Sequence, residues 1–250
     1  MKRWDGKVAV ITGANSGIGA AIVEDLVNLG LKVVGLARRK EKLEELARTL
    51  DGKEGKFYPF QADVTQEESV VKAFQWATEN VGPVSILVNS AGLGKPINLT
   101  EGKIEDFRKI LDTNVLGICI ATKEAVQIMK KNNIDGHVIN INSVVGHMVP
   151  PIAHYNVYPA SKYAVTALTE TLRHELRDLN TKIKVTSISP GLVDTPIFEV
   201  NGYNYDNAPI LKIAPRLQAK DVSDAVLYVL GTPPNVQVTE LTIKPLGELI

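Results

Sequence analysis

Cysteine is almost absent from this chain, which contains only Cys119 and therefore cannot form an internal disulfide. The residues around it, 115–120, are apolar, and this favours a buried packing role for Cys119 over a catalytic thiol. Long apolar runs are missing as well, since none approaches the roughly 18 residues of a membrane-spanning helix. The apolar segment 8–11 leads straight into a glycine loop and not into a signal-peptide cleavage site. These absences predict a cytoplasmic protein without a membrane span.

An excess of charge is missing too, because 28 Lys and Arg residues balance 28 Asp and Glu residues. Such a chain has no overall field that would attract nucleic acid or an anionic membrane. The His, Cys and carboxylate residues show no metal-ligand spacing. No nucleic-acid, membrane or metal partner is therefore predicted.

Short β-branched runs alternate with longer segments of helical period along the sequence. The inner runs are continuously apolar, which is typical of strands covered on both faces in a parallel sheet. This alternation predicts one doubly wound α/β domain over residues 1–250, with a seven-stranded parallel sheet and helices on both faces. The expected strands are 7–12, 32–37, 56–61, 85–89, 137–142, 184–189 and 237–244. The expected helices are 18–29, 41–50, 67–80, 104–130, 161–180 and 222–230, the last capped by Asp221 or Ser223.

One region, about residues 191–216, has little periodicity and follows the end of a predicted strand. Ligands of open α/β sheets bind at strand ends, and a long irregular segment in a compact domain is usually functional. Its apolar residues could cover an apolar substrate as a mobile flap, or could simply pack the loop down. These residues are Ile197, Phe198, Val200, Tyr203, Tyr205, Ile210 and Leu211.

A glycine loop separates the first predicted strand from the first predicted helix, with Gly13, Gly17 and Gly19 in the spacing G-x-x-x-G-x-G. Glycines permit a tight turn and let backbone N–H groups approach a pyrophosphate, which a helix N-terminus also favours. The spacing is neither the G-x-G-x-x-G fingerprint nor a Walker loop. A purely structural turn is the alternative, but the position between strand and helix favours dinucleotide binding.

The end of the second predicted strand indicates which dinucleotide is bound. An NAD site would have an acid here for the ribose hydroxyls, whereas this chain has Ala37 followed by Arg38 and Arg39. The planar guanidinium of arginine suits a 2′-phosphate. A solvated basic start to the next helix is the alternative, and NADP(H) is the prediction.

Tyr158 and Lys162 lie four positions apart and would project from one face of a helix. Pro159 fits only the first helical turn, which places Tyr158 at the helix entrance. A free phenol has a pKa of about 10, and an adjacent cation is expected to lower it. Such a phenol could donate a proton to a reduced carbonyl or accept one from an alcohol. Ser143, at the end of a predicted strand, could hydrogen-bond the same oxygen.

With these motifs, the whole chain resembles the short-chain dehydrogenases/reductases. Asp63 and Val64 resemble the adenine-binding pair of that family, and residues 89–92 resemble its Asn-Asn-Ala-Gly, with Ser90 in place of the second asparagine. The resemblance implies a Rossmann-type fold. It also implies that the cofactor is bound by Gly13, Asn15, Ser16, Gly17, Ile18, Gly19, Arg38, Arg39, Asp63, Val64, Asn89, Ala91, Gly92, Tyr158, Lys162, Pro190, Gly191, Val193 and Thr195.

The resemblance assigns catalytic roles to four residues. Tyr158 would be the general acid/base, and Ser143 would orient and polarise the substrate oxygen. Lys162 would bind the nicotinamide ribose and tune Tyr158, and Asn114 would hold a water in the proton relay. His147 and His154 flank this region but are expected to be loop histidines.

One departure from the family concerns the cofactor phosphate. Many NADP-using relatives carry a basic residue where this chain has Asn15. Phosphate recognition is therefore expected to rest on Arg38, with Arg39 second.

Within the family, residues 157–176, 189–198 and 241–245 are similar to the farnesol dehydrogenases of insects and to vertebrate keto-reductases that act on steroids and dicarbonyls. This implies an NADP(H)-dependent oxidoreductase acting on a lipophilic alcohol or carbonyl. Relatives commonly form homodimers or homotetramers through helices that match 104–130 and 161–180. The direction of reaction does not follow, because Tyr158 can serve both ways.

Two other functions stay open. A catalytically silent NADPH-binding regulatory or scaffold protein would keep the fold, although every catalytic position here holds a competent residue. An epimerase or dehydratase would normally need a larger C-terminal domain than the segment that follows Gly191.

Overall fold

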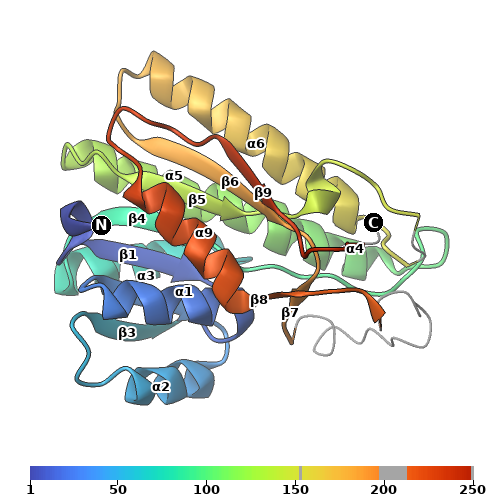
Figure 1. The fold of residues 1–250 in the computed structure, drawn as a ribbon, viewed down its shortest axis with the longest axis horizontal. Helices are drawn as coiled ribbons and strands as arrows, with labels where there is room; N and C mark the ends of the chain where they lie inside the picture. The colour runs from blue at the N-terminus through green and yellow to red at the C-terminus, as the bar shows by residue number, and fades with distance from the viewer. Residues whose placement is uncertain (152–153, 197–212, 249–250) are drawn as a thin grey trace.

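The computed structural model describes residues 1–151, 154–196 and 213–248. Within them, seven parallel strands form one sheet in the order β3-β2-β1-β4-β5-β6-β9 (Figure 1). The predicted doubly wound α/β domain is thereby confirmed. The strands are β1 (Val8–Thr12), β2 (Lys32–Ala37), β3 (Lys56–Gln61), β4 (Val84–Asn89), β5 (His137–Ile141), β6 (Lys184–Pro190) and β9 (Glu240–Ile243).

Helices cover both faces of this sheet. The first face packs against α1 (Gly17–Asn28), α2 (Lys40–Thr49) and α9 (Ala219–Gly231), and in Figure 1 α1 and α9 lie on the near side. The second face packs against α3 (Glu67–Asn80), α5 (Gly117–Lys131) and α6 (Tyr158–Asp178). Side chains alternate along a strand, so Ile11 enters the first core and its neighbour Val10 the second. This double burial is the reason that the inner strands are apolar at every position.

The predicted long helix 104–130 is interrupted in the structure. It consists of α4 (Ile104–Leu111), a π-helical stretch (Asp112–Leu116) and α5. The apolar period continues through all three parts and gives no sign of the interruption. A π-bulge changes the direction in which side chains project and is frequent at functional sites, and here it contains the buried Asn114.

The predicted cap of the last helix was only partly right. Gln218 is the N-cap of α9, and the Asp221 side chain completes a capping box by accepting a hydrogen bond from the Gln218 N–H at 2.7 Å. Ser223 caps nothing, because it is fully buried and its hydroxyl donates to the Asp25 carboxylate of α1 at 2.6 Å. Ser223 therefore fastens α9 to α1.

Two short strands that the sequence did not predict join the ends of the irregular region. β7 (Val193–Asp194) pairs in parallel with β8 (Leu217–Gln218). The seven apolar residues of the predicted flap, from Ile197 to Leu211, lie outside the described residues. Across the three described ranges, no helix is long and apolar enough to cross a membrane.

Phe74→Ala on α3 is expected to lower the free energy of unfolding by about 3–5 kcal/mol, because this fully buried ring fills the core of the second face. Lys72→Ala, at an exposed position of the same helix, is the control and should stay within about 0.5 kcal/mol of the wild type. Urea denaturation measures both. A loss below about 1 kcal/mol for Phe74→Ala would show that this core repacks freely.

Candidate active site

A cleft of about 540 Å³ opens at the carboxyl ends of the strands. The sheet order reverses between β1 and β4, and ligands of doubly wound sheets bind in the crevice outside such a switch point. Thirteen of the predicted cofactor residues line this cleft: Gly13, Asn15, Ser16, Gly17, Ile18, Gly19, Arg38, Arg39, Asp63, Val64, Ala91, Gly92 and Thr195. The structure thus brings together residues from five separate segments, and their contacts with a cofactor stay a prediction.

The glycine loop has the shape that a pyrophosphate requires. Gly17, the first residue of α1, has a φ of +53°, which favours glycine. A Cβ on Gly19 would lie 2.3 Å from the Gly13 carbonyl oxygen, so the helix can approach the loop this closely only without a side chain there. The N–H groups at the start of α1 face the cleft through Gly17, Ile18 and Gly19. The loop therefore fits the diphosphate of a dinucleotide.

The two arginines after β2 have different surroundings. When the Asn15 amide is oriented so that both of its ends are satisfied, its oxygen accepts hydrogen bonds from Nη2 and Nε of Arg39, at 2.7 and 2.9 Å. Arg39 is thereby held against the glycine loop. The Arg38 backbone carbonyl accepts from Gln61, but its guanidinium makes no hydrogen bond or ion pair within the described ranges. Arg38 therefore presents an unpaired cation to the cleft.

Several predicted cofactor residues do not line this cleft. Asn89 is buried, and its amide donates to Thr122 Oγ1 at 3.1 Å and to Asn140 Oδ1 at 2.9 Å, which ties β4 to its neighbours. The Val193 side chain packs in the first core, so only its backbone is free for a ligand. Pro190 is the last residue of β6 and Gly191 follows it, a few positions before the cleft residue Thr195, and their role stays a prediction.

Leu93 and Thr113 are cleft residues that the sequence reasoning missed. The Asn114 amide holds Leu93 on both sides: Oδ1 accepts from its N–H at 2.8 Å, and Nδ2 donates to its carbonyl at 2.9 Å. Nδ2 also donates to Ser161 Oγ at 3.0 Å. Asn114 thus links the wall of the cleft to α6, and the water-holding role implied for it stays a prediction.

Tyr158 is the first residue of α6, three positions before the expected helix 161–180, because Pro159 belongs to its first turn as its chemistry indicated. Lys162 lies one turn later and is 6% exposed, with its Nζ 5.9 Å from the centre of the Tyr158 ring. Nζ donates a hydrogen bond at 3.0 Å to the carbonyl of Ile141, the last residue of β5. The ammonium is therefore fixed at the carboxyl edge of the sheet.

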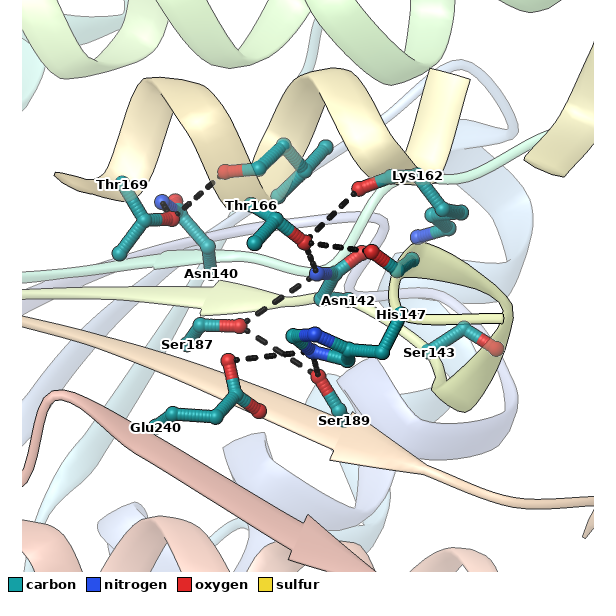
Figure 2. Close-up of polar contacts among 12 residues, drawn as sticks. Asn140, Asn142, Ser143, His147, Lys162, Thr166, Thr169, Ser187, Ser189 and Glu240 are labelled. Atoms are coloured by element: carbon teal, nitrogen blue, oxygen red, sulfur yellow. Dashed lines mark hydrogen bonds and ion pairs between the residues drawn. The ribbon is translucent and has the colours of Figure 1, made fainter. Parts of the chain in front are cut away.

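Ser143 completes this group from the other side of β5. It caps a one-turn 3₁₀ helix (Val144–Gly146), and its Oγ accepts from the Val145 N–H at 3.3 Å. Its hydroxyl is close enough to the Tyr158 phenol to lower the pKa of that group. Figure 2 shows Ser143 and Lys162 at the same end of the sheet. Three of the four predicted catalytic residues thus meet, and the fourth, Asn114, reaches them through Ser161.

The family described as short chain dehydrogenase matches residues 7–205. The chain belongs to this family. A farnesol dehydrogenase of Aedes aegypti is 49% identical over 252 residues, which cover 99% of each protein. The dehydrogenase/reductase SDR family member 11 of Gallus gallus is 44% identical over 254 residues, which cover both proteins fully. The resemblance found from sequence motifs is confirmed.

Solved structures of the same fold hold either nicotinamide cofactor. The closed form of a serine dehydrogenase complexed with NADP⁺ has a TM-score of 0.84 at 32% identity, with 94% of each chain covered. A short-chain dehydrogenase/reductase of Burkholderia phymatum in complex with NAD has a TM-score of 0.87 at 28% identity, with 97% of this chain and 90% of that one covered. The choice of cofactor therefore rests on the residues of this chain.

In this short-chain dehydrogenase, burial shifts the pKa values of the two titratable groups of the site, Tyr158 and Lys162. Although Tyr158 is partly exposed, protein surrounds its hydroxyl, and the lost hydration raises the pKa of Tyr158 above its ordinary value. Tyr155 adds to the rise, and the hydrogen bond with Ser143 opposes it. Burial lowers the pKa of Lys162 to about 8. The expectation that Lys162 lowers the pKa of Tyr158 is therefore wrong, because desolvation raises this pKa and Lys162 is not among the groups that shift it.

The two flanking histidines do not join the reacting groups. His147 follows the Ser143 turn, and its ring points toward β6 and β9 (Figure 2). His154 lies in the segment before α6 with a φ of +68°. In the parts of the chain that the structure describes, no three His, Cys, Asp or Glu side chains converge to hold a metal ion.

In the protein without cofactor, Lys162→Met is expected to raise the free energy of unfolding near pH 7 by about 1–3 kcal/mol. The cause is the buried charge, which lowers the pKa of Lys162 in the folded protein to about 8. Above that pH the unfolded chain, in which lysine has its ordinary pKa, binds more protons than the folded protein. Wild-type stability should then rise between about pH 8 and pH 10, and the advantage of the variant should disappear over the same range. Urea denaturation across this range measures it, with Lys72→Met as the exposed control. A stability gain of Lys162→Met that does not change with pH would contradict the lowered pKa assigned to Lys162.

Proposed function

We propose that this short-chain dehydrogenase uses NADP(H) to interconvert a lipophilic carbonyl compound and its alcohol, with farnesal and farnesol as the pair to test first. The proposal is carried by the meeting of Tyr158, Ser143 and Lys162 at the carboxyl edge of β5. Asn114 connects this group to Leu93 in the wall of the cleft. A proton donor and an oxygen-orienting hydroxyl therefore lie next to the place proposed for the cofactor.

The charge at the end of β2 is the reason for proposing NADP(H) as the cofactor. Ala37 supplies no carboxylate there, and the unpaired guanidinium of Arg38 lines the cleft. A phosphate on the adenosine ribose would receive charge-assisted hydrogen bonds from this guanidinium. The reduced nicotinamide, when bound, supplies the hydride for the carbonyl carbon. Lys162 would hold the nicotinamide ribose, and Asp63 and Val64 the adenine.

The chain's own residues handle the proton. In the direction of reduction, the carbonyl oxygen gains negative charge as its carbon accepts the hydride, and Tyr158 donates its phenolic proton to that oxygen. The Ser143 hydroxyl donates a hydrogen bond to the same oxygen and stabilises the developing charge. Tyr158 is protonated at neutral pH, as a phenol of ordinary pKa already is, so it can donate its proton in the reductive direction. In the oxidative direction Tyr158 must lose its proton first, and the cation of Lys162 would stabilise the phenolate.

The substrate class rests on two supports. The relative that is 49% identical is named a farnesol dehydrogenase, and the sequence between β7 and β8 is rich in large apolar residues. A segment with such side chains could cover a lipophilic molecule.

The proposed assembly is a homodimer or homotetramer in the cytoplasm. Large apolar side chains are exposed along the two helical regions that carry contacts in many relatives: Ile104, Leu111, Leu116, Tyr163 and Leu179. Burying them against a second copy would remove this apolar surface from water. The NADPH pool of the cytoplasm would favour reduction.

Tyr158→Phe is expected to reduce turnover of farnesal by about 10²–10⁴-fold, because the proton donor is lost, while NADPH still binds. NADPH absorbance gives the rate, and NADPH fluorescence gives the affinity. Tyr228→Phe, at an exposed position of α9, is the matched control. Binding of NADPH without turnover in the wild type, across farnesal, ketosteroids and dicarbonyls, would support a catalytically silent binding protein instead.

Arg38→Asp is expected to weaken NADPH use by about 10-fold or more while leaving NADH use nearly unchanged, because only NADPH carries the phosphate. The measurement is kcat/KM with each cofactor. Arg48→Asp, exposed on α2, makes the same charge change and should leave the ratio of the two values as in the wild type. Equal losses with both cofactors in Arg38→Asp would rule out this role for Arg38.

A further inference from the structure

The turn that carries Ser143 is anchored at its far end by a histidine that the proposed reaction does not use. Ser143 and His147 are the N-cap and C-cap of the 3₁₀ helix, and the His147 ring points toward Ser189 and Glu240 (Figure 2). Its Nε2 lies 3.1 Å from Ser189 Oγ and 3.4 Å from Glu240 Oε2. Both partners belong to the edge of the sheet, since Ser189 is on β6 and Glu240 begins β9. The imidazole therefore fastens one end of the turn to these two strands.

Glu240 has little else to bind. Its Oε1 is buried and has no hydrogen-bond partner among the described residues, and its Oε2 lies beside the His147 imidazole. A carboxylate of a sheet edge could face solvent freely, but this side chain is only 31% exposed and turns toward the imidazole. In the described part of the chain, His147 is the one polar side chain with which the Glu240 carboxylate pairs.

The near end of the same turn is held by a second set of contacts. Asn142, directly before Ser143, donates through Nδ2 to Thr166 Oγ1 at 2.9 Å. The Thr166 hydroxyl lies 3.0 Å from the Gly146 carbonyl and 3.3 Å from the Lys162 carbonyl, and its single proton can serve either one. The turn is thus fixed to α6 by Asn142 and Thr166, and to β6 and β9 by His147.

Little space remains for the turn to shift while these contacts hold. A Cβ on Gly146 would lie 2.8 Å from Asn142 Nδ2 and 2.8 Å from the Lys162 carbonyl oxygen. Hence a movement of the His147 end would be transmitted through this tightly packed turn to Ser143.

We propose that His147, held by Glu240 and Ser189, is a positioning residue that fixes the Ser143 hydroxyl against Tyr158. The inference rests on the proposed function in taking Ser143 and Tyr158 as the groups that meet the substrate oxygen. His147 itself touches neither the substrate nor the cofactor. β9, the last strand of the sheet, becomes a support of the active site through one side chain.

A double-mutant cycle between His147 and Ser143 tests this proposal. His147→Ala should lower kcat for farnesal by about 10–100-fold, because a displacement of the order of 1 Å misaligns the reacting groups. NADPH affinity and melting temperature should stay near the wild-type values. In the Ser143→Ala background the same change should lower kcat by less than about 3-fold, because the hydroxyl that His147 positions is already gone. Glu240→Gln should lower kcat by less than His147→Ala does. His147→Gln keeps a hydrogen-bond donor, so its kcat should lie between the values of His147→Ala and the wild type.

His174→Ala is the matched control, because His174 pairs with Glu170 at 3.0 Å on the exposed face of α6. It should leave kcat unchanged in both backgrounds. Equal losses from His147→Ala with and without Ser143 would overturn the proposal, as would a loss explained entirely by unfolded protein.

Crystal structures of the wild type and of His147→Ala separate this inference from the proposed function. If the wild type turns over no carbonyl or alcohol, the proposed function fails, but the structures still decide the positioning role. The proposal expects the Ser143 hydroxyl to leave Tyr158 in the variant. A Ser143 hydroxyl that keeps its wild-type position beside Tyr158 would overturn it.

Discussion

The candidate site depends on one interaction, the hydrogen bond from the buried Lys162 ammonium to the last carbonyl of β5. Burying this cation has a cost, which appears as a lowered pKa, and within the described residues no carboxylate lies beside Lys162 to offset it. A backbone carbonyl can hold the charge only if the first turns of α6 lie directly against the end of the strand. That placement brings Tyr158, one turn earlier, to the carboxyl edge of the sheet beside the end of β5. One interaction therefore constrains the position of α6, the cleft and the proton donor together.

The same constraint explains the polar groups that surround α6. Asn114 ties the helix to Leu93 on the cleft side, and Asn142 and Thr166 tie it to the Ser143 turn. Each of these side chains is buried or partly buried and takes up hydrogen bonds that would otherwise be unsatisfied next to the sheet. The helix is held from two sides, and this sets Tyr158 beside the Ser143 turn.

Local patterns in the sequence predicted most of this arrangement. The alternation of strands and helices sufficed for the sheet, because each inner strand is apolar on both faces, and Pro159 alone placed the start of α6. The glycine spacing located the cleft. What could not be predicted depends on contacts between distant residues: the π-helical stretch at Asn114, the pairing of Asn15 with Arg39, and the contact of His147 with Glu240. The direction in which the pKa of Tyr158 is shifted could not be predicted for a related reason. Desolvation depends on packing in three dimensions, whereas the four-residue spacing from Tyr158 to Lys162 shows only that a cation is near.

The central claim is that hydride passes between a nicotinamide and a carbonyl carbon at this site. The most direct measurement uses NADPH carrying deuterium at one or the other face of the nicotinamide C4, with farnesal as substrate and mass spectrometry of the product. The account predicts farnesol with one deuterium on the carbinol carbon from one labelled form and none from the other, because a fixed site presents a single face of the ring. Farnesol without deuterium from either form, or oxidation of NADPH without farnesol, would contradict it.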